Sequence, residues 1–434
     1  MAVRRSPAFA VPDGESTRGV DSARKTEILQ TADTLFATSG LRTSLQEIAD
    51  AAGILAGSLY HHFESKEAIF VELLRRYHAA LDRVGENAQS QLDDIHPEEV
   101  AARIYALGSA IARTAVEHRA ALHMSFHEAP SENPELVALV QQRPKVVQDA
   151  MLQTLRAGRW SGYIRNDVDL PLLADRICQT MLHVGLDVIR NNASADRVAA
   201  LSCRILLEGL STPPYPDAEL DESKAFVAAE TVIEGWAAEA EQEQPTDKTS
   251  IVRRAARSEF GRKGYELTTI RDIAAVTGLG TGTVYRAMGS KDELLAAIMQ
   301  SFGERLGAGW DAVLQTDSTP SEKLDALTWL QINVLVRFHD EFRIQLAWMR
   351  HSPPSTPNPG WQFAARMTQL KTLLNLGLRS GDLQIESRSR ELLSRCVIDI
   401  MWLPENIVRT AGTRKASQLG RDTLLRGVVA RGAR

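Results

Sequence analysis

Residues 43–70 of this 434-residue chain occur a second time, in altered form, as residues 268–295. The two copies align without a gap at a constant spacing of 225 positions (268 minus 43). A repeat of this kind is one supersecondary unit used twice, so the fold must contain two related units. Positions identical in both copies include, by their numbers in the first, Ile48, Ala49, Gly53, Gly57, Tyr60, Ser65 and Lys66.

Each copy contains the signals for a short helix, a tight turn and a second short helix. Ser44 with Glu47 has the spacing of a capping box, in which each residue satisfies a free backbone N–H of the other; Thr269 with Asp272 repeats it. Gly53 stands where the first helix must end, at a position that favours positive φ. Two small helices joined by such a turn form the helix-turn-helix, which lays its second helix in the major groove of DNA.

An amphipathic helix precedes each copy and ends at a glycine, Gly40 or Gly264. With this helix included, about fifty residues of each copy resemble the DNA-binding domain of the TetR family of transcription regulators. The shared pattern is helix, Gly, Thr-Thr or Thr-Ser, Ile-Ala, Gly, Gly-x-x-Tyr and Ser-Lys. The apolar positions of the preceding helix are Ile28, Ala32, Leu35 and Phe36 in the first copy, and Val252, Ala256 and Phe260 in the second.

The resemblance implies an all-α fold of two fused TetR-like units, each with a helix-turn-helix domain followed by a helical effector and dimerisation bundle. Between the units, three prolines in residues 211–216 stop a helix, and ten Asp or Glu face a single Lys from Asp217 to Asp247. An apolar face that includes Trp236 argues that part of this stretch packs on the body. The expected divisions are a flexible arm (1–20), a first DNA-binding domain (21–85), a first bundle (86–211), an acidic linker (212–246), a second DNA-binding domain (247–301) and a second bundle (302–434).

Composition excludes several classes of protein. With 44% hydrophobic residues the chain can bury full cores, yet no apolar run approaches the roughly 20 residues of a spanning helix. Residues 1–20 lack the apolar core of a signal peptide. Cys178, Cys203 and Cys396 have no paired spacing, which fits a reducing cytoplasm and no metal motif. Because no Ser/His/Asp order, phosphate loop or paired carboxylates stand out, we expect neither an enzyme nor a cofactor.

The TetR resemblance also implies which residues contact DNA. In that family the helix after the turn contacts bases, while its Tyr and the following Ser-Lys hold phosphates. Thr, Ser and Arg are suited to base edges and Lys to a phosphate on chemical grounds as well. The predicted base contacts are Ala56, Ser58, His61, Thr281, Thr283 and Arg286; the predicted phosphate contacts are Tyr60, Lys66, Tyr285 and Lys291; and Ser44, Thr269 and Arg271 join them from the preceding helix.

The two copies differ in charge and in sequence. Residues 246–291 hold nine Lys or Arg against four Asp or Glu, whereas residues 18–66 hold five against six. Because phosphate neutralisation supplies most non-specific affinity, we expect the second copy to bind DNA more tightly. The second copy also replaces the family's Tyr-His-His-Phe by residues 285–288, Tyr-Arg-Ala-Met. A competing hypothesis is therefore a helical ligand-binding or structural protein that has lost DNA binding in one or both repeats.

The bundles are expected to bind a small hydrophobic effector, because some tandem proteins that resemble this one govern lipid or sterol genes; a lipid, a sterol or an acyl-CoA would fit. Core packing is the alternative for each candidate. His123 and His127 lie one helical turn apart, but such a pair alone does not make a metal site. The candidates are Tyr105, His123, Phe126, His127, Trp160, Met181 and His183 in the first bundle, and Trp329, Phe338, Trp348 and Trp361 in the second.

The last helices of each bundle occupy the position through which proteins of the TetR family dimerise. Since both units lie in one chain, we expect them to pair with each other as a pseudo-dimer that binds one asymmetric operator as a repressor. Alternatively, each bundle pairs with its copy in a second chain, giving a four-headed dimer. The residues expected to face one another are Leu173, Ile177, Met181 and Ile205 from the first unit, and Leu393, Val397, Ile400 and Leu425 from the second.

Overall fold

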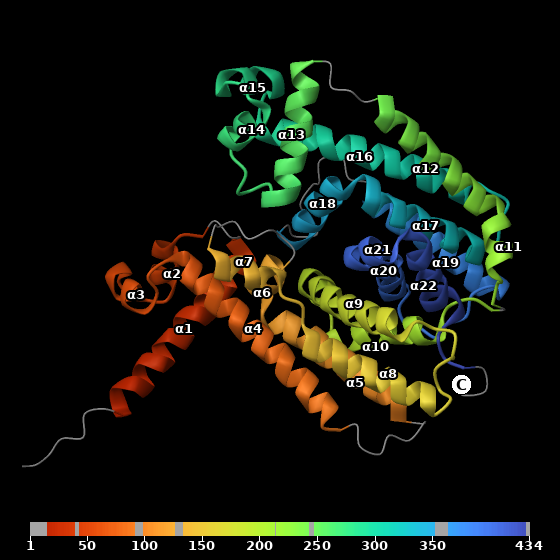
Figure 1. The fold of residues 1–434 in the computed structure, drawn as a ribbon, viewed down its shortest axis with the longest axis horizontal. Helices are drawn as coiled ribbons and strands as arrows, with labels where there is room; N and C mark the ends of the chain where they lie inside the picture. The colour runs from red at the N-terminus through yellow and green to blue at the C-terminus, as the bar shows by residue number, and fades with distance from the viewer. Residues whose placement is uncertain are drawn as a thin grey trace, which may run out of the picture.

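The computed structural model describes residues 15–39, 43–91, 99–125, 133–212, 214–242, 247–351 and 363–430. Within these ranges every regular secondary-structure element is a helix, and β-pairing is limited to two isolated bridges (Figure 1). The predicted all-α fold is confirmed. No described helix combines the length and apolar character needed to cross a membrane.

The first unit consists of a small head followed by a bundle. Helix α1 begins at Glu15, within the arm that we expected to be flexible, and residues 1–14 lie outside the described part. The apolar spacing from Leu136 to Ala157 predicts a single helix, and this prediction is wrong: Pro144 separates two helices, because proline cannot donate the bond that would continue the first. The helices are α1 (Glu15–Ser39), α2 (Leu45–Ala51), α3 (Ala56–His62), α4 (Lys66–Gln89), α5 (Val100–Glu117), α6 (Arg119–Met124), α7 (Pro134–Gln141), α8 (Lys145–Trp160), α9 (Leu170–Asn191) and α10 (Ala195–Glu208).

The acidic stretch between the repeats forms two helices, α11 (Asp217–Glu222) and α12 (Lys224–Gln242). Helix α12 packs along α16 and α17 of the second unit. Phe226 stacks on Trp329 with 5.7 Å between ring centroids, and Trp236 meets Phe338 edge-on at 5.1 Å. The prediction that its apolar face packs on the body is confirmed, so α12 is part of the second unit's core rather than a free tether.

The second unit repeats the plan of the first. Pro404 separates two helices, and the four prolines from 353 to 359 lie outside the described residues. Figure 1 shows both heads toward one side of the view, with the bundles toward the other. The helices are α13 (Lys248–Lys263), α14 (Ile270–Thr277), α15 (Thr281–Met288), α16 (Lys291–Leu314), α17 (Pro320–Arg337), α18 (His339–His351), α19 (Phe363–Ser380), α20 (Arg390–Met401), α21 (Glu405–Ala411), α22 (Thr413–Gly420) and the π-helix η2 (Arg421–Arg426).

The two bundles pack on each other within the chain, with α9 and α10 against α20 and η2 (Figure 1). The segments that follow α10 and η2, residues 207–212 and 425–430, bind reciprocally, and we call them the clasp. The N–H of Leu210 donates to the carbonyl of Leu425 (3.0 Å), and the N–H of Val428 donates to the carbonyl of Leu207 (2.7 Å). Such an exchange of equivalent bonds is the pattern of a two-fold interface.

Buried side chains reinforce the contact between the units. Arg176 of α9 is fully buried and donates to Thr423 Oγ1 (2.9 Å) and to the carbonyl of Ile400 (2.6 Å). All eight residues predicted to face each other lie buried on α9, α10, α20 and η2, the helices that make this contact. Met181 does not face the second unit: it packs inward, with its sulfur 3.7 Å from that of Cys203.

Candidate nucleic-acid interface

The first head holds its motif together by local bonds. Ser44 Oγ accepts from the N–H of Glu47 (3.2 Å), and the N–H of Ser44 donates to Glu47 Oε2 (2.7 Å). The pKa of Glu47 is lowered mainly by the backbone and hydroxyl bonds from Ser44. Gly53 has a φ of +65°, so α2 ends in the left-handed turn expected there. The capping box and the glycine turn are confirmed, and together they set the angle between α2 and α3.

The second head repeats these bonds and adds a charge. Thr269 and Asp272 form the same capping box, and Gly278 has a φ of +67°. Lys263 at the end of α13 donates to Asp272 Oδ1 (2.8 Å). Burial opposes ionisation of Asp272, but the bonds from Lys263 and Thr269 outweigh it and lower its pKa to about 2. The ion pair ties the end of α13 to the start of α14.

Helices α3 and α15 present equivalent outward faces. One apolar residue anchors each of them, Leu59 in α3 and Val284 in α15, and both are fully buried. The tyrosine at the same position of each head, Tyr60 or Tyr285, is 55% exposed. Of the predicted base contacts, Ser58, His61, Thr281 and Arg286 are exposed, and Ala56 and Thr283 are half-buried. The predicted base contacts of both α3 and α15 are therefore accessible to DNA.

The predicted phosphate lysines begin the helix that follows each motif, and their stems lie along their own head. Lys66 Nζ donates to the carbonyl of Thr43 (3.3 Å), and partial burial lowers its pKa. Lys291 Nζ lies 4.2 Å from the centre of the Tyr265 ring. Both ammonium groups are therefore positioned by contacts within their own head, Lys66 by the carbonyl of Thr43 and Lys291 by the ring of Tyr265. Arg271 on α14 is exposed and adds a further positive charge to the second head.

Comparison with known proteins decides the family. The model of the bacterial regulatory proteins of the tetR family matches residues 28–73 and again residues 252–298. The HTH-type transcriptional repressor KstR2 of Rhodococcus jostii strain RHA1 is 34% identical over 215 residues, which are 46% of this chain and 98% of that protein. The chain belongs to the TetR family. It is a DNA-binding transcription regulator with two TetR motifs in one polypeptide.

Two further relatives cover about one unit of this tandem TetR protein. KstR2 of Mycolicibacterium smegmatis is 35% identical over 156 residues, which are 35% of this chain and 73% of that protein. A solved structure of the ketosteroid transcriptional regulator KstR2 of Mycobacterium tuberculosis is 30% identical, covers 41% of this chain and 89% of its own, and gives a TM-score of 0.35.

The residues that link each TetR head to its bundle are not apparent in the motif. Asp33 on α1 accepts from the N–H of Ala120 at the start of α6 (3.1 Å), and burial raises its pKa to about 6. In the second head, Arg257 on α13 forms an ion pair with the buried Glu341 of α18 (3.2 Å). The sequence contains one signal for the first link: Asp33 lies one helical turn after Leu29, on an otherwise apolar helix face.

The structure separates the predicted effector residues rather than gathering them. Trp329 and Phe338 are buried against α12, and the pKa of Tyr105 is raised above its usual value by burial. His123 is buried in α6, and His183 is half-buried in α9. Core packing, the alternative, therefore describes Met181, Trp329 and Phe338. Outside the described residues lie Phe126, His127 and Trp361, as does the side chain of Trp348.

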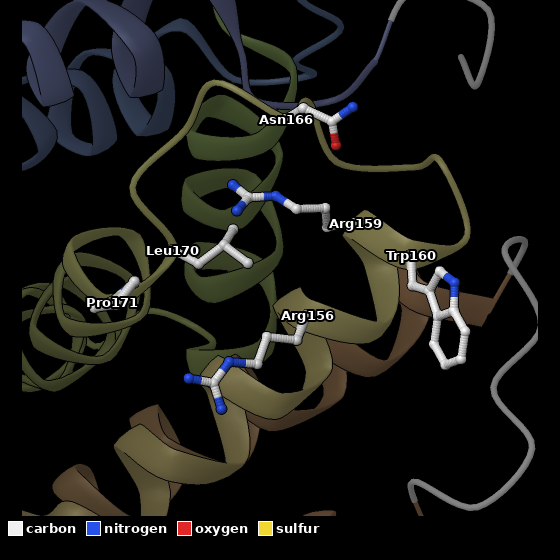
Figure 2. Close-up of a pocket in the computed structure, with 6 residues that line it drawn as sticks. All are labelled: Arg156, Arg159, Trp160, Asn166, Leu170 and Pro171. Carbon is white, nitrogen blue, oxygen red and sulfur yellow. The ribbon is translucent and has the colours of Figure 1, made fainter.

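Trp160 does not line the interior of the first bundle. It is 95% exposed at the end of α8, beside a surface hollow of about 530 Å³. Figure 2 shows Arg156 and Arg159 on the side of Leu170, while the Trp160 ring points away from them. Trp160 therefore lines this surface hollow, together with Arg156, Arg159 and Leu170, and not the interior of the bundle.

Proposed function

We propose that this regulator is a repressor whose two unlike heads bind one asymmetric operator from a single chain. The observation that carries the proposal is the reciprocal clasp, in which Leu210 and Val428 bind the opposite unit by equivalent bonds. TetR proteins pair through the last helices of their bundles, and here the chain supplies both partners of that contact. A second chain is then not needed to bring two heads to DNA.

The two heads differ where bases would be contacted. The residues in the first are Ala56, Ser58 and His61, and those in the second are Thr281, Thr283 and Arg286. Since Arg pairs well with guanine and Ala offers no hydrogen bond, the half-sites should differ in sequence. The excess of positive charge in the second head supports tighter phosphate binding there. The DNA contacts and the domain divisions predicted above belong to this proposal.

An effector bound in a bundle would release DNA by moving a head. Two contacts support such coupling: Asp33 with the N–H of Ala120, and Arg257 with Glu341. The first contact joins α1 to α6, and the second joins α13 to α18. The proposed effector is a small hydrophobic molecule, a class that includes the ketosteroids named for the regulator from Mycobacterium tuberculosis.

A gel-shift assay on DNA from upstream of the protein's own gene tests the regulator. The expected result is one retarded species at low salt, lost when the predicted phosphate contacts of both heads are removed together by Lys66→Ala and Lys291→Ala. A helical ligand-binding protein without DNA contact would give no shift even at low salt, and that result would overturn the proposal.

A further inference from the structure

An uncompensated positive charge lies inside the second bundle. Arg366 on α19 is 3% exposed, and neither of its Nη groups has a hydrogen-bond partner among the described residues. Within that part of the chain no carboxylate forms an ion pair with it, and burial lowers its pKa to about 10. A buried charge without a partner is strongly unfavourable, so such a group is expected to meet an opposite charge in at least one state of the protein.

The same chain shows how it satisfies a buried arginine when the purpose is structural. Arg421 is 6% exposed and binds Asp221 (2.6 Å), Asp325 (2.9 Å) and Asp217 (3.2 Å). Arg176 donates to two acceptors across the joint between the units through Nε and Nη2, and only its Nη1 has no partner among the described residues. Arg366 follows neither pattern.

Two other buried polar groups lie at the level of Arg366. Trp310 Nε1 on α16 and Gln331 Oε1 on α17 have no hydrogen-bond partner among the described residues, and both side chains are at most 1% exposed. Helices α17 and α19 pack on each other, and Pro320 at the start of α17 approaches Gly377 near the end of α19. Gln331 and Arg366 each lie eleven residues beyond that contact, so they stand at the same height.

Trp310 of α16 is placed at this height by its two neighbours in the chain. Gly309 abuts Leu330, and Asp311 accepts from Gln369 of α19 (2.7 Å). Trp310 lies between Gly309 and Asp311 in the chain. Three helices therefore bring two kinds of donor, an indole and a guanidinium, and one amide to a single level of the bundle.

The first unit has no polar group at the matching positions. Helices α4 and α16 have equal lengths, as do α5 and α17, so Trp310 corresponds to Gly85 and Gln331 to Ile111. The spacing that relates Gly158 to Gly377 makes Arg366 correspond to Val147. A Cβ on Gly85 would stand 2.8 Å from the N atom of Val147, so these positions touch in the first unit. The second unit replaces a tight apolar contact by polar groups at the same place.

We propose that the second bundle, and not the first, binds an apolar molecule with a free carboxylate, which Arg366 holds by its two Nη groups. A carboxylate has two acceptor oxygens that match the guanidinium fork and can also take the Trp310 N–H. Buried Leu330 and Leu370 supply apolar surface for the rest of the molecule. The inference rests on the proposed function, in that the carboxylate is the effector. A coenzyme A thioester lacks the free carboxylate.

Thermal shift and calorimetry on the full chain test the assignment. The probes are dodecanoic, hexadecanoic and cholanic acids, their methyl esters and dodecanoyl-CoA. We expect at least one acid to raise the Tm while its ester does not, and Arg366→Met to weaken that acid about tenfold or more. Without ligand, Arg366→Met should raise the Tm, whereas Arg421→Met should lower it.

Three results would overturn the assignment: no acid stabilises the protein, the acid binds Arg366→Met as tightly as wild type, or Arg366→Met lowers the Tm without ligand. Stabilisation by dodecanoyl-CoA alone, unchanged in Arg366→Met, would also overturn it. Gel shifts on the same samples separate the two proposals, because a retained shift leaves the regulator standing when the carboxylate site fails.

Discussion

Gly209 and Gly427 meet at the joint between the two units, each against the other's backbone. A Cβ on Gly209 would stand 2.3 Å from the N atom of Gly427, and a Cβ on Gly427 would stand 2.2 Å from the carbonyl oxygen of Glu208. Both have positive φ, +71° and +73°, with ψ near 180° at Gly209. Only glycine adopts that conformation readily, so the clasp requires it twice.

Gly209→Ala is expected to weaken the joint. The added methyl group has no space, and the backbone conformation disfavours any side chain, so the free energy of unfolding should fall by about 2 to 4 kcal/mol. Urea denaturation measures the change. Gly235→Ala on the exposed side of α12 is the matched control, because nothing lies within 4 Å of its Cβ; it should raise stability by about 0.5 to 1 kcal/mol. Equal effects of the two substitutions would contradict the close approach.

Asp33→Asn tests the link between the first head and its bundle through pH. Burial raises the folded-state pKa of Asp33 from 3.8 to about 6, so the folded state binds the proton more tightly than the unfolded state between these values. The free energy of unfolding therefore falls as pH rises from 3.8 through 6. Asn keeps the acceptor for the N–H of Ala120 and carries no charge, so the variant should exceed wild type by about 2 kcal/mol near pH 7.5 and by nothing near pH 3.5. A constant difference across this range would contradict a titrating Asp33.

Lys291→Ala and Tyr285→Phe should weaken DNA binding for all sequences alike. Both remove a predicted phosphate contact, so each should lower the slope of log affinity against log salt, Lys291→Ala by about 1. Filter binding at several salt concentrations gives the slope. An unchanged affinity of Lys291→Ala at about 0.15 M salt would show that the family's phosphate role does not extend to the second head.

Arg286→Ala should instead change sequence preference. Arg286 is exposed on α15 and has the chemistry of a guanine contact. Its loss should cost about 1 to 3 kcal/mol on the preferred half-site and much less on non-specific DNA. Selection of binding sequences by the variant and by wild type checks this. His61→Ala is the companion in the first head, and it should relax a different half-site.

The heads were predictable because their structure is set by local signals. The boxes at Ser44 and Thr269 and the turns at Gly53 and Gly278 depend on residues three to five positions apart. The apolar face of α12, which includes Trp236, likewise predicted that this helix packs on the body of the protein. Each of these features needs only the chain's own neighbouring residues to form.

The joint and the buried charges were not predictable in detail. Arg176 binds Thr423, which lies 247 positions away, and periodicity gives no information on such pairs. Met181 was expected at the joint because it lies on an apolar stripe, yet α9 is buried on several sides and its stripe alone does not show which neighbour each residue meets. Arg366 occurs on a helix with ordinary amphipathic spacing, so only the structure shows that it is buried and that its Nη groups have no partner among the described residues.

The mass of the protein bound to its operator, with the footprint of the same complex, tests the central claim most directly. Multi-angle light scattering should find one chain of 47.8 kDa per duplex, and hydroxyl-radical footprinting should find two protected half-sites of unlike sequence about one helical turn apart. Two chains per duplex on a palindromic footprint would contradict the single-chain pseudo-dimer.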